Sequence, residues 1–148
     1  MIIDIHCHLF SMDQGQMEKR FRANDGLISF LYKTAKKMGK NISIEGVIKN
    51  AVETWGDPTG ERLISSMDES GIDVSVILNV DDLTQTMQEK NMLIGEIVRK
   101  YPKRIIGFAG VDPRRSDGPD MLKQCFEEFG LKGLKYHPDN GFDPAGPQ

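Results

Sequence analysis

The sequence predicts an α/β fold built on a sheet of about four parallel strands with helices on the outside. Short apolar runs rich in β-branched residues alternate with longer segments whose apolar residues recur at helical spacing. The expected order is strand, helices, strand, helix, strand, helix, strand. Alternation of this kind is typical of right-handed crossovers and of a parallel sheet. A chain of 148 residues is long enough for one domain with a sizeable core.

The first predicted strand carries two of the three histidines in the chain. Residues 2–9 contain three isoleucines, which favours a buried strand. Because alternate side chains of a strand share a face, we expect Asp4, His6 and His8 on one side and the apolar residues between them on the other. Two imidazoles about 6.5 Å apart at Cα can converge on one metal ion at about 2.0–2.1 Å. A pair of structural histidines is the alternative interpretation.

The next segments are predicted from helix caps, glycine stops and prolines. Residues 11–24 are expected to form a loop on the histidine side of the sheet, because Gly15 and scattered charges interrupt any periodic pattern. Helices are expected at 27–38 after an Asn24–Asp25 cap, at 44–54 after Ser43, at 61–69 before Gly71, at 86–101 before Pro102 and at 116–129 before Gly130. Further strands are expected at 73–80, 104–111 and 131–138.

The third histidine closes the last predicted strand. His137 stands just before Pro138, which ends the ladder. All three histidines therefore lie at the ends of predicted strands, where α/β proteins collect ligands. Three neutral imidazoles suit zinc, iron, manganese or nickel better than calcium or magnesium. The sequence thus predicts one divalent metal, with zinc as the first choice, held by His6, His8 and His137.

Charge and composition exclude several classes of partner. The net charge is −3 and no basic stripe with interleaved aromatics occurs, so we expect no nucleic acid to bind. No apolar run approaches the roughly 20 residues of a membrane span, and the N-terminus lacks the features of a secretory signal. Cys7 and Cys125 do not make a disulfide framework. We therefore expect a cytoplasmic protein with no membrane partner.

Four stretches of the chain resemble the amidohydrolase superfamily, and more closely the branch named for aminocarboxymuconate-semialdehyde decarboxylase. His-x-His alone is a weak signal, but the four blocks in this order and spacing are specific. They cover residues 3–8, 67–73, 101–113 and 130–138.

The resemblance implies a TIM-type (β/α) barrel with one divalent metal, often zinc, at the C-terminal ends of its strands. His6 and His8 match the ligands of the first strand, and His137 matches a ligand of a middle strand. The implied activity is hydrolysis of an amide, lactone or related bond in a small carboxylated substrate. Non-oxidative decarboxylation on the same metal frame is the alternative. In the family a later histidine and a late-strand aspartate complete the site, and since this sequence has neither, no catalytic residue is assigned.

Four other polar residues are candidates for a role at this site. Asp4 is expected to orient a ligand imidazole or to satisfy a buried amide. Asn79 and Asp112, at the ends of the second and third strands, either touch substrate or form turns. Lys135 is expected to be a charge partner inside the mouth of the barrel.

The chain is short for the fold that it resembles. A barrel of this type takes about 250 residues and eight strands, and only four strands are predicted. We expect residues 1–138 to be the N-terminal half of a metal-dependent hydrolase barrel and residues 139–148 to be a Gly/Pro-rich tail. A truncated chain that is inactive alone is the preferred interpretation. A homo-oligomer that covers the open sheet edges, or a non-catalytic half-barrel that persists through association, is the alternative.

Overall fold

The computed structural model describes residues 1–9, 14–79 and 86–136. The chain divides into two compact units, one made of residues 1–9 and 59–148 and the other of residues 10–58. The predicted tail at 139–148 lies outside the described residues, as does His137.

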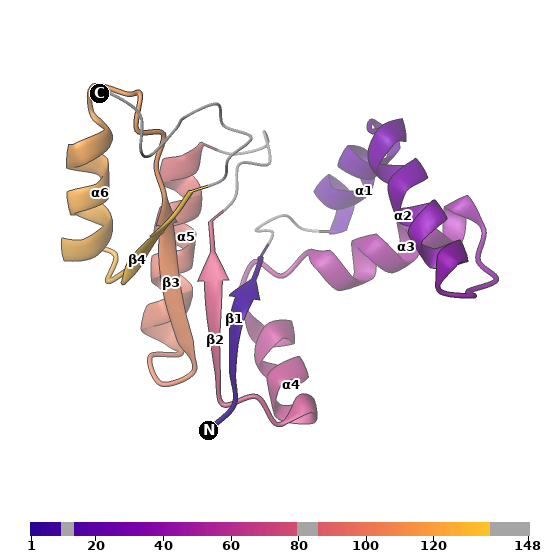
Figure 1. Ribbon diagram of the computed structural model, residues 1–148, viewed down its shortest axis with the longest axis horizontal. Coiled ribbons are helices and arrows are strands. Elements are labelled where there is room, and N and C mark those ends of the chain that lie inside the picture. Colours follow the sequence, from indigo (N-terminus) through magenta and orange to yellow (C-terminus); the bar gives the residue numbers. More distant parts are fainter. Residues whose placement is uncertain (10–13, 80–85, 137–148) are drawn as a thin grey trace. The chain divides into compact units, whose positions relative to one another are not determined.

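The first unit is a parallel α/β sheet, as the sequence predicted (Figure 1). Its four strands follow one another in the order β1-β2-β3-β4, and every neighbouring pair is parallel. Parallel neighbours need a crossover, and a helix supplies each one. The elements are β1 (Ile3–Cys7), α4 (Glu61–Ser70), β2 (Val74–Leu78), α5 (Met87–Lys100), β3 (Ile105–Gly110), α6 (Gly118–Glu127) and β4 (Gly133–Lys135).

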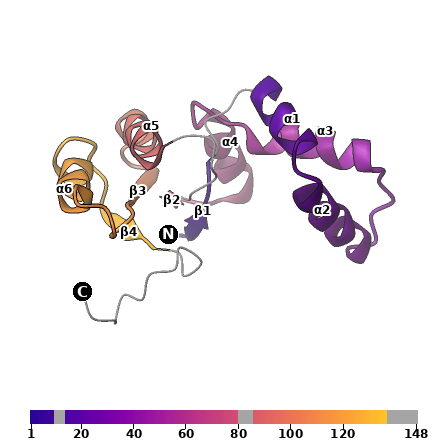
Figure 2. The ribbon, with the colours of Figure 1, turned by 90° about the horizontal axis from the view of Figure 1, so that it is seen from above.

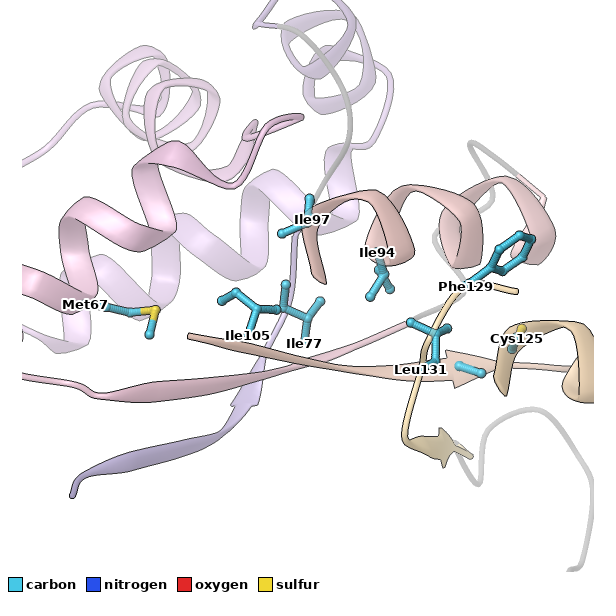
Figure 3. Packing of buried hydrophobic residues seen from close by; sticks show 9 residues of the cluster. Met67, Ile77, Ile94, Ile97, Ile105, Cys125, Phe129 and Leu131 are labelled. Carbon is cyan, nitrogen blue, oxygen red and sulfur yellow. The ribbon is translucent and has the colours of Figure 1, made fainter. Parts of the chain in front are cut away.

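One face of this sheet is covered by α4, α5 and α6, which lie along the same side of the strands (Figure 2). Side chains from strands and helices meet there in one cluster, in which every residue is at most 9% exposed (Figure 3). The cluster consists of Met67, Ile77, Ile94, Ile97, Ile105, Ala109, Cys125, Phe129 and Leu131. Helix α5 approaches strand β3 closely at Gly107. A Cβ atom at this position would lie 2.6 Å from side-chain atoms of Ile94 on α5 and of Leu131.

The two edge strands expose large apolar side chains. Ile3 and Ile5 of β1 are 44% and 74% exposed, and Leu134 of β4 is 47% exposed. The prediction that the first strand is buried is therefore wrong for its isoleucines. In the part of the chain that the structure describes, β1 pairs with another strand on one side only, whereas β2 and β3 each pair on both sides. Open edges of this kind are what we expected of a partial barrel.

The second unit contains three helices, α1 (Gln14–Arg22), α2 (Asp25–Lys37) and α3 (Ile44–Trp55). The loop predicted at 11–24 is wrong from residue 14 onward, because Met17 and Phe21 share a helix face at i, i+4 and are each 1% exposed. They pack with residues of α2 and α3, namely Ile28, Ile48, Ala51 and Val52.

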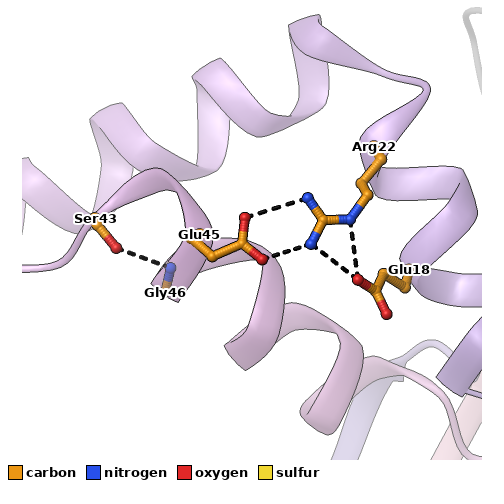
Figure 4. Close-up of polar contacts among 5 residues, drawn as sticks. All are labelled: Glu18, Arg22, Ser43, Glu45 and Gly46. Carbon is orange, nitrogen blue, oxygen red and sulfur yellow. Dashed lines mark hydrogen bonds and ion pairs between the residues drawn. The ribbon is translucent and has the colours of Figure 1, made fainter.

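Polar contacts hold the ends of these three helices. The side chains of Asn24 and Ser43 accept the N-terminal N–H groups of α2 and α3, as the sequence predicted. Arg22 donates to Glu18 on its own helix at 2.9 Å and to Glu45 of α3 at 3.2 Å (Figure 4). Its guanidinium group lowers the pKa of the Glu45 carboxyl group below its usual value.

None of the helices that the structure describes in either unit is long and apolar enough to cross a bilayer.

Candidate metal site

His6 and His8 come together at the C-terminal end of β1, as predicted. Their Nε2 atoms are 3.0 Å apart. The ring centroids are separated by 4.8 Å and the ring planes cross at 88°, so the two rings meet edge to face. The pair therefore presents two imidazole nitrogens at a single point beyond the end of the strand.

A β-bulge in the first strand changes the face on which its residues lie. Asp4 aligns with Ser75 of β2, but the next aligned pair is Cys7 with Ile77. Three steps along β1 thus correspond to two along β2, so two residues occupy the place of one. The predicted strict alternation of faces is wrong here, because pairing with β2 is interrupted between Asp4 and Cys7.

Asp4 holds the backbone at this bulge. Its Oδ1 atom accepts the backbone N–H of His6 at 3.0 Å. An inserted residue leaves part of the ladder unpaired, and the carboxylate provides a partner for that N–H group. Of the two roles predicted for Asp4, the structure shows the bond to an amide, although the residue is not fully buried.

The backbone of β2 determines which nitrogen of His8 carries the proton. His8 Nδ1 lies 3.1 Å from the carbonyl oxygen of Leu78. A carbonyl oxygen can only accept a hydrogen bond, so Nδ1 carries the hydrogen and Nε2 keeps its lone pair. Histidine ligands of metals are commonly fixed in this way, with the second nitrogen bonded to a backbone carbonyl or carboxylate. In the hydrogen bond between the two rings, His8 Nε2 is thus the acceptor and His6 Nε2 the donor, and a bound metal ion would take the place of that hydrogen.

The spacing of the two nitrogens fits a shared metal ion. Bonds of about 2.0–2.1 Å place two nitrogens about 2.9 Å apart at a right angle and about 3.3 Å apart at the tetrahedral angle. The separation of 3.0 Å between the Nε2 atoms of His6 and His8 falls in this interval. Within residues 1–9, 14–79 and 86–136, no group of three His, Cys, Asp or Glu side chains is arranged to hold a metal ion. The described residues thus include two of the three predicted ligands, and the third, His137, lies outside them.

Behind His8, two buried asparagines connect β2, α5 and β3. Asn79 Nδ2 donates to Asn91 Oδ1 at 2.6 Å and to the carbonyl oxygen of Met87 at 3.2 Å. Asn91 in turn binds both backbone groups of Gly110, donating to its carbonyl oxygen at 2.8 Å and accepting its N–H at 2.9 Å. Asn79 is 3% exposed and Asn91 is fully buried. Asn79 is therefore part of an interior network, while the residues that would form the predicted turn, 80–82, lie outside the described part of the chain.

Asn91 was not predicted from the sequence as a residue near the site. A signal was present, because Asn91 precedes Ile94 and Val98 at i+3 and i+7 and so lies on the apolar face of the helix. A polar residue at such a position must find a partner inside the protein.

The orientation of the Asn79 amide follows from its neighbours. Both partners of Nδ2 are acceptors that could not bond to an oxygen in its place. Its Oδ1 atom is buried and has no hydrogen-bond partner among the residues that the structure describes. A buried oxygen without a partner costs about 1–3 kcal/mol.

The remaining predicted site residues have other surroundings. Asp112 forms a turn in which Oδ1 accepts the Arg114 N–H at 3.0 Å and both carboxylate oxygens contact the guanidinium group. These bonds lower the pKa of Asp112 to about 2. Lys135 is half-buried on β4, and its relation to His137 lies outside the described residues.

A hollow of about 710 Å³ lies at the other end of the sheet, where the strands begin. It is lined by residues that include Met1, Val74 and Arg104. Arg104 donates to the carbonyl oxygens of Ile72 and Asp73 at 3.0 and 2.9 Å. These bonds tie the start of β3 to the loop before β2. The hollow is thus remote from the histidine pair and is bordered by groups that bond to one another.

Solved structures that share this fold include two decarboxylases with bound manganese and a hydratase. A 5-carboxyvanillate decarboxylase from Novosphingobium aromaticivorans with bound manganese shares 19% identity and a TM-score of 0.59. A 4-oxalomesaconate hydratase from Rhodopseudomonas palustris shares 21% identity and a TM-score of 0.55. A dihydroxybenzoic acid decarboxylase from Polaromonas sp. JS666, with bound manganese and the inhibitor 2-nitroresorcinol, shares 20% identity and a TM-score of 0.55. No protein-family model matches the chain.

These structures are amidohydrolase-superfamily barrels, so the resemblance predicted from the four sequence blocks is confirmed at the level of the fold. The alignments cover 90%, 99% and 90% of this chain, but only 41%, 45% and 37% of the respective structures. The chain thus spans about two fifths of the length of the proteins whose fold it shares.

Proposed function

We propose that this chain is the N-terminal part of a metal-dependent enzyme that acts on a small carboxylated substrate. The observation that carries the proposal is the pair of Nε2 atoms of His6 and His8, 3.0 Å apart at the C-terminal end of a strand in this fold. That end of a barrel is where active sites lie in essentially every characterised case. In this proposal residues 1–138 are the N-terminal half of the barrel, and residues 139–148 are a tail.

The ligands of the proposed site are His6, His8 and His137. Imidazole nitrogens suit zinc, iron, nickel and manganese, and manganese is the ion bound in two of the similar structures. When bound, such an ion polarises a carboxylate or carbonyl group and lowers the pKa of a bound water toward about 7. His8 contributes by keeping its hydrogen on Nδ1, bonded to Leu78, and its lone pair on Nε2. Asp4 contributes by fixing the backbone of His6.

Two reactions are compatible with this metal frame. Decarboxylation of a carboxylated aromatic acid is supported by the names of the decarboxylases that share the fold. Hydrolysis of an amide or lactone needs a base beside the metal-bound water, and no residue of this chain is assigned that role. We therefore favour the decarboxylase, with the hydrolase as the alternative. We also propose a cytoplasmic location, in keeping with the buried Cys125 thiol.

A non-catalytic half-barrel that persists through association is a second candidate. The observation that favours it is the exposure of Ile3 and Ile5 on the edge strand β1. Such a protein would bind no metal tightly and would be stable only as an oligomer.

Metal titration separates the two candidates. The chelator-treated chain is titrated with Zn²⁺ and Mn²⁺, beside His6→Ala, His8→Ala and the control Asp73→Asn, which changes an exposed carboxylate at the other end of the sheet. We expect one ion per chain for the unchanged protein and the control, and loss of binding in both histidine variants. Equal binding by all four proteins, or none by any, contradicts the proposal.

Activity assays complete the test. The metal-loaded chain is incubated with carboxylated aromatic acids, and the products are analysed for carbon dioxide and for ring-opened acids. We expect no turnover by the 148-residue monomer, because the described residues supply four strands and a barrel of this type has eight. Turnover by the monomer contradicts the view that this chain is an incomplete catalyst.

A further inference from the structure

We propose that Asn79 and Asn91 are positioning residues for His8, which hold the peptide whose carbonyl group fixes the imidazole. The inference rests on the metal site proposed above, but the geometry that carries it belongs entirely to described residues of the first unit.

The peptide between Leu78 and Asn79 is held from both sides. Its N–H donates to the carbonyl oxygen of Phe108 on β3 at 3.2 Å. Its carbonyl oxygen, on the Leu78 side, is 3.1 Å from His8 Nδ1. The N–H and C=O of a trans peptide point in opposite directions within one rigid plane. A rotation of this plane therefore disturbs both bonds together, and the His8 ring moves with the peptide.

The side chain of Asn79 prevents that rotation. Its Nδ2 atom is bonded to α5 through Met87 and through Asn91. Asn91 is anchored to both backbone groups of Gly110, at the end of β3. A continuous set of hydrogen bonds thus runs from β3 through α5 and β2 to the imidazole of His8.

The fit around this network is close. A Cβ atom on Gly110 would lie 2.9 Å from Asn79 Cγ and 2.8 Å from Met87 Sδ. Contacts this short do not occur between ordinary side chains, so one of the groups would have to move. Asn79 also keeps a buried Oδ1 without a partner in the described chain. An apolar side chain of the same size would avoid that unpaired oxygen, whereas only the amide supplies the bonds that fix the Leu78–Asn79 peptide.

Two variants disturb the network in different ways. Asn79→Leu keeps the branching of the side chain at Cγ and removes the amide. Gly110→Ala keeps both asparagines but adds a methyl group that contacts Asn79. Two controls leave the network intact. Ser75→Ala changes a fully buried hydroxyl group on the same strand, and Ile97→Val removes a methyl group from the core face of α5.

Three measurements are made on each protein, at a pH above the ordinary imidazole pKa of about 6.5. Ring ¹⁵N chemical shifts of the metal-free protein report the tautomer of His8. Competition with a chromophoric chelator gives the Zn²⁺ affinity, and urea denaturation gives the stability. We expect the unchanged protein to hold the hydrogen of His8 on Nδ1. We expect Asn79→Leu and Gly110→Ala to mix the tautomers and to weaken Zn²⁺ binding about 10- to 100-fold, as loss of other supporting partners of histidine ligands does.

The controls distinguish positioning from general stability. Ser75→Ala and Ile97→Val are expected to keep the tautomer and the affinity, even where the urea midpoint falls. Unchanged tautomer and affinity in a folded Asn79→Leu or Gly110→Ala protein overturns the inference. If the unchanged protein binds no Zn²⁺, the proposed function fails, while the tautomer measurement still decides whether the asparagines position His8.

Discussion

Two isoleucines of neighbouring strands distinguish the open edge of the sheet from its core. Ile5 on β1 is 74% exposed, whereas Ile77 on β2 is 0% exposed. Full burial of an isoleucine contributes about 1.5–3 kcal/mol, so the covered quarter of Ile5 contributes about 0.4–0.8 kcal/mol. Ile5→Thr keeps a β-branched residue in the strand, and we expect it to lower the free energy of unfolding by less than about 1 kcal/mol. Ile77→Thr buries a hydroxyl group in the core, and we expect a loss of about 3 kcal/mol or more.

The assay is urea denaturation followed by far-ultraviolet circular dichroism, at two protein concentrations about tenfold apart. If the edge of β1 is uncovered in solution, Ile5→Thr lowers the free energy of unfolding only slightly at both protein concentrations. The urea midpoint of the unchanged protein is then also the same at both concentrations. If Ile5→Thr is as costly as Ile77→Thr, and the midpoint rises with concentration, a second polypeptide covers β1 in solution. That result refutes the description of this strand as an open edge.

Three further predictions concern single side chains of the first unit. Arg104→Leu removes two hydrogen bonds to carbonyl groups and an ion pair with Asp68. We expect the free energy of unfolding, measured by thermal melts, to fall by about 2 kcal/mol. An unchanged melting temperature contradicts this expectation. The Asp112 carboxyl group should titrate at a pKa of about 2 by NMR and return toward 3.8 in Arg114→Ala. Because its folded pKa is the lower one, the stabilisation by Asp112 is present above pH 3.8 and is lost as the pH falls through about 2. Burial raises the pKa of the Cys125 thiol to about 11; alkylation by iodoacetamide at neutral pH should require unfolding, and rapid labelling without urea is the contrary result.

The central strands and the helix caps could be predicted from the sequence because their signals are local. Apolar runs at 73–80 and 104–111 indicated strands that the structure places at Val74–Leu78 and Ile105–Gly110. Ser43 accepts a hydrogen bond within three residues of itself, so its role does not depend on the rest of the fold.

The features that were missed depend on partners distant in the chain. The helix α1 shows only Met17 and Phe21 as apolar signals among its charges, and their burial requires α2 and α3. The bulge in β1 arises from pairing with β2, about 70 residues away, which the alternation of side chains does not encode. For the candidate site, the convergence of His6 and His8 was predicted, because both belong to one strand. The contribution of Asn91 was not predicted, because its partners lie outside its own helix, directly after β2 and at the end of β3.

The most direct measurement is the broadening of histidine ring signals by small amounts of Mn²⁺. The paramagnetic ion broadens nuclei steeply with proximity, so less than one equivalent identifies the side chains around it. We expect the ring signals of His6 and His8 to disappear together while the methyl signal of Met1, at the start of the sheet, stays sharp. Sharp histidine signals beside a broadened Met1 signal would place the ion elsewhere and contradict the metal site.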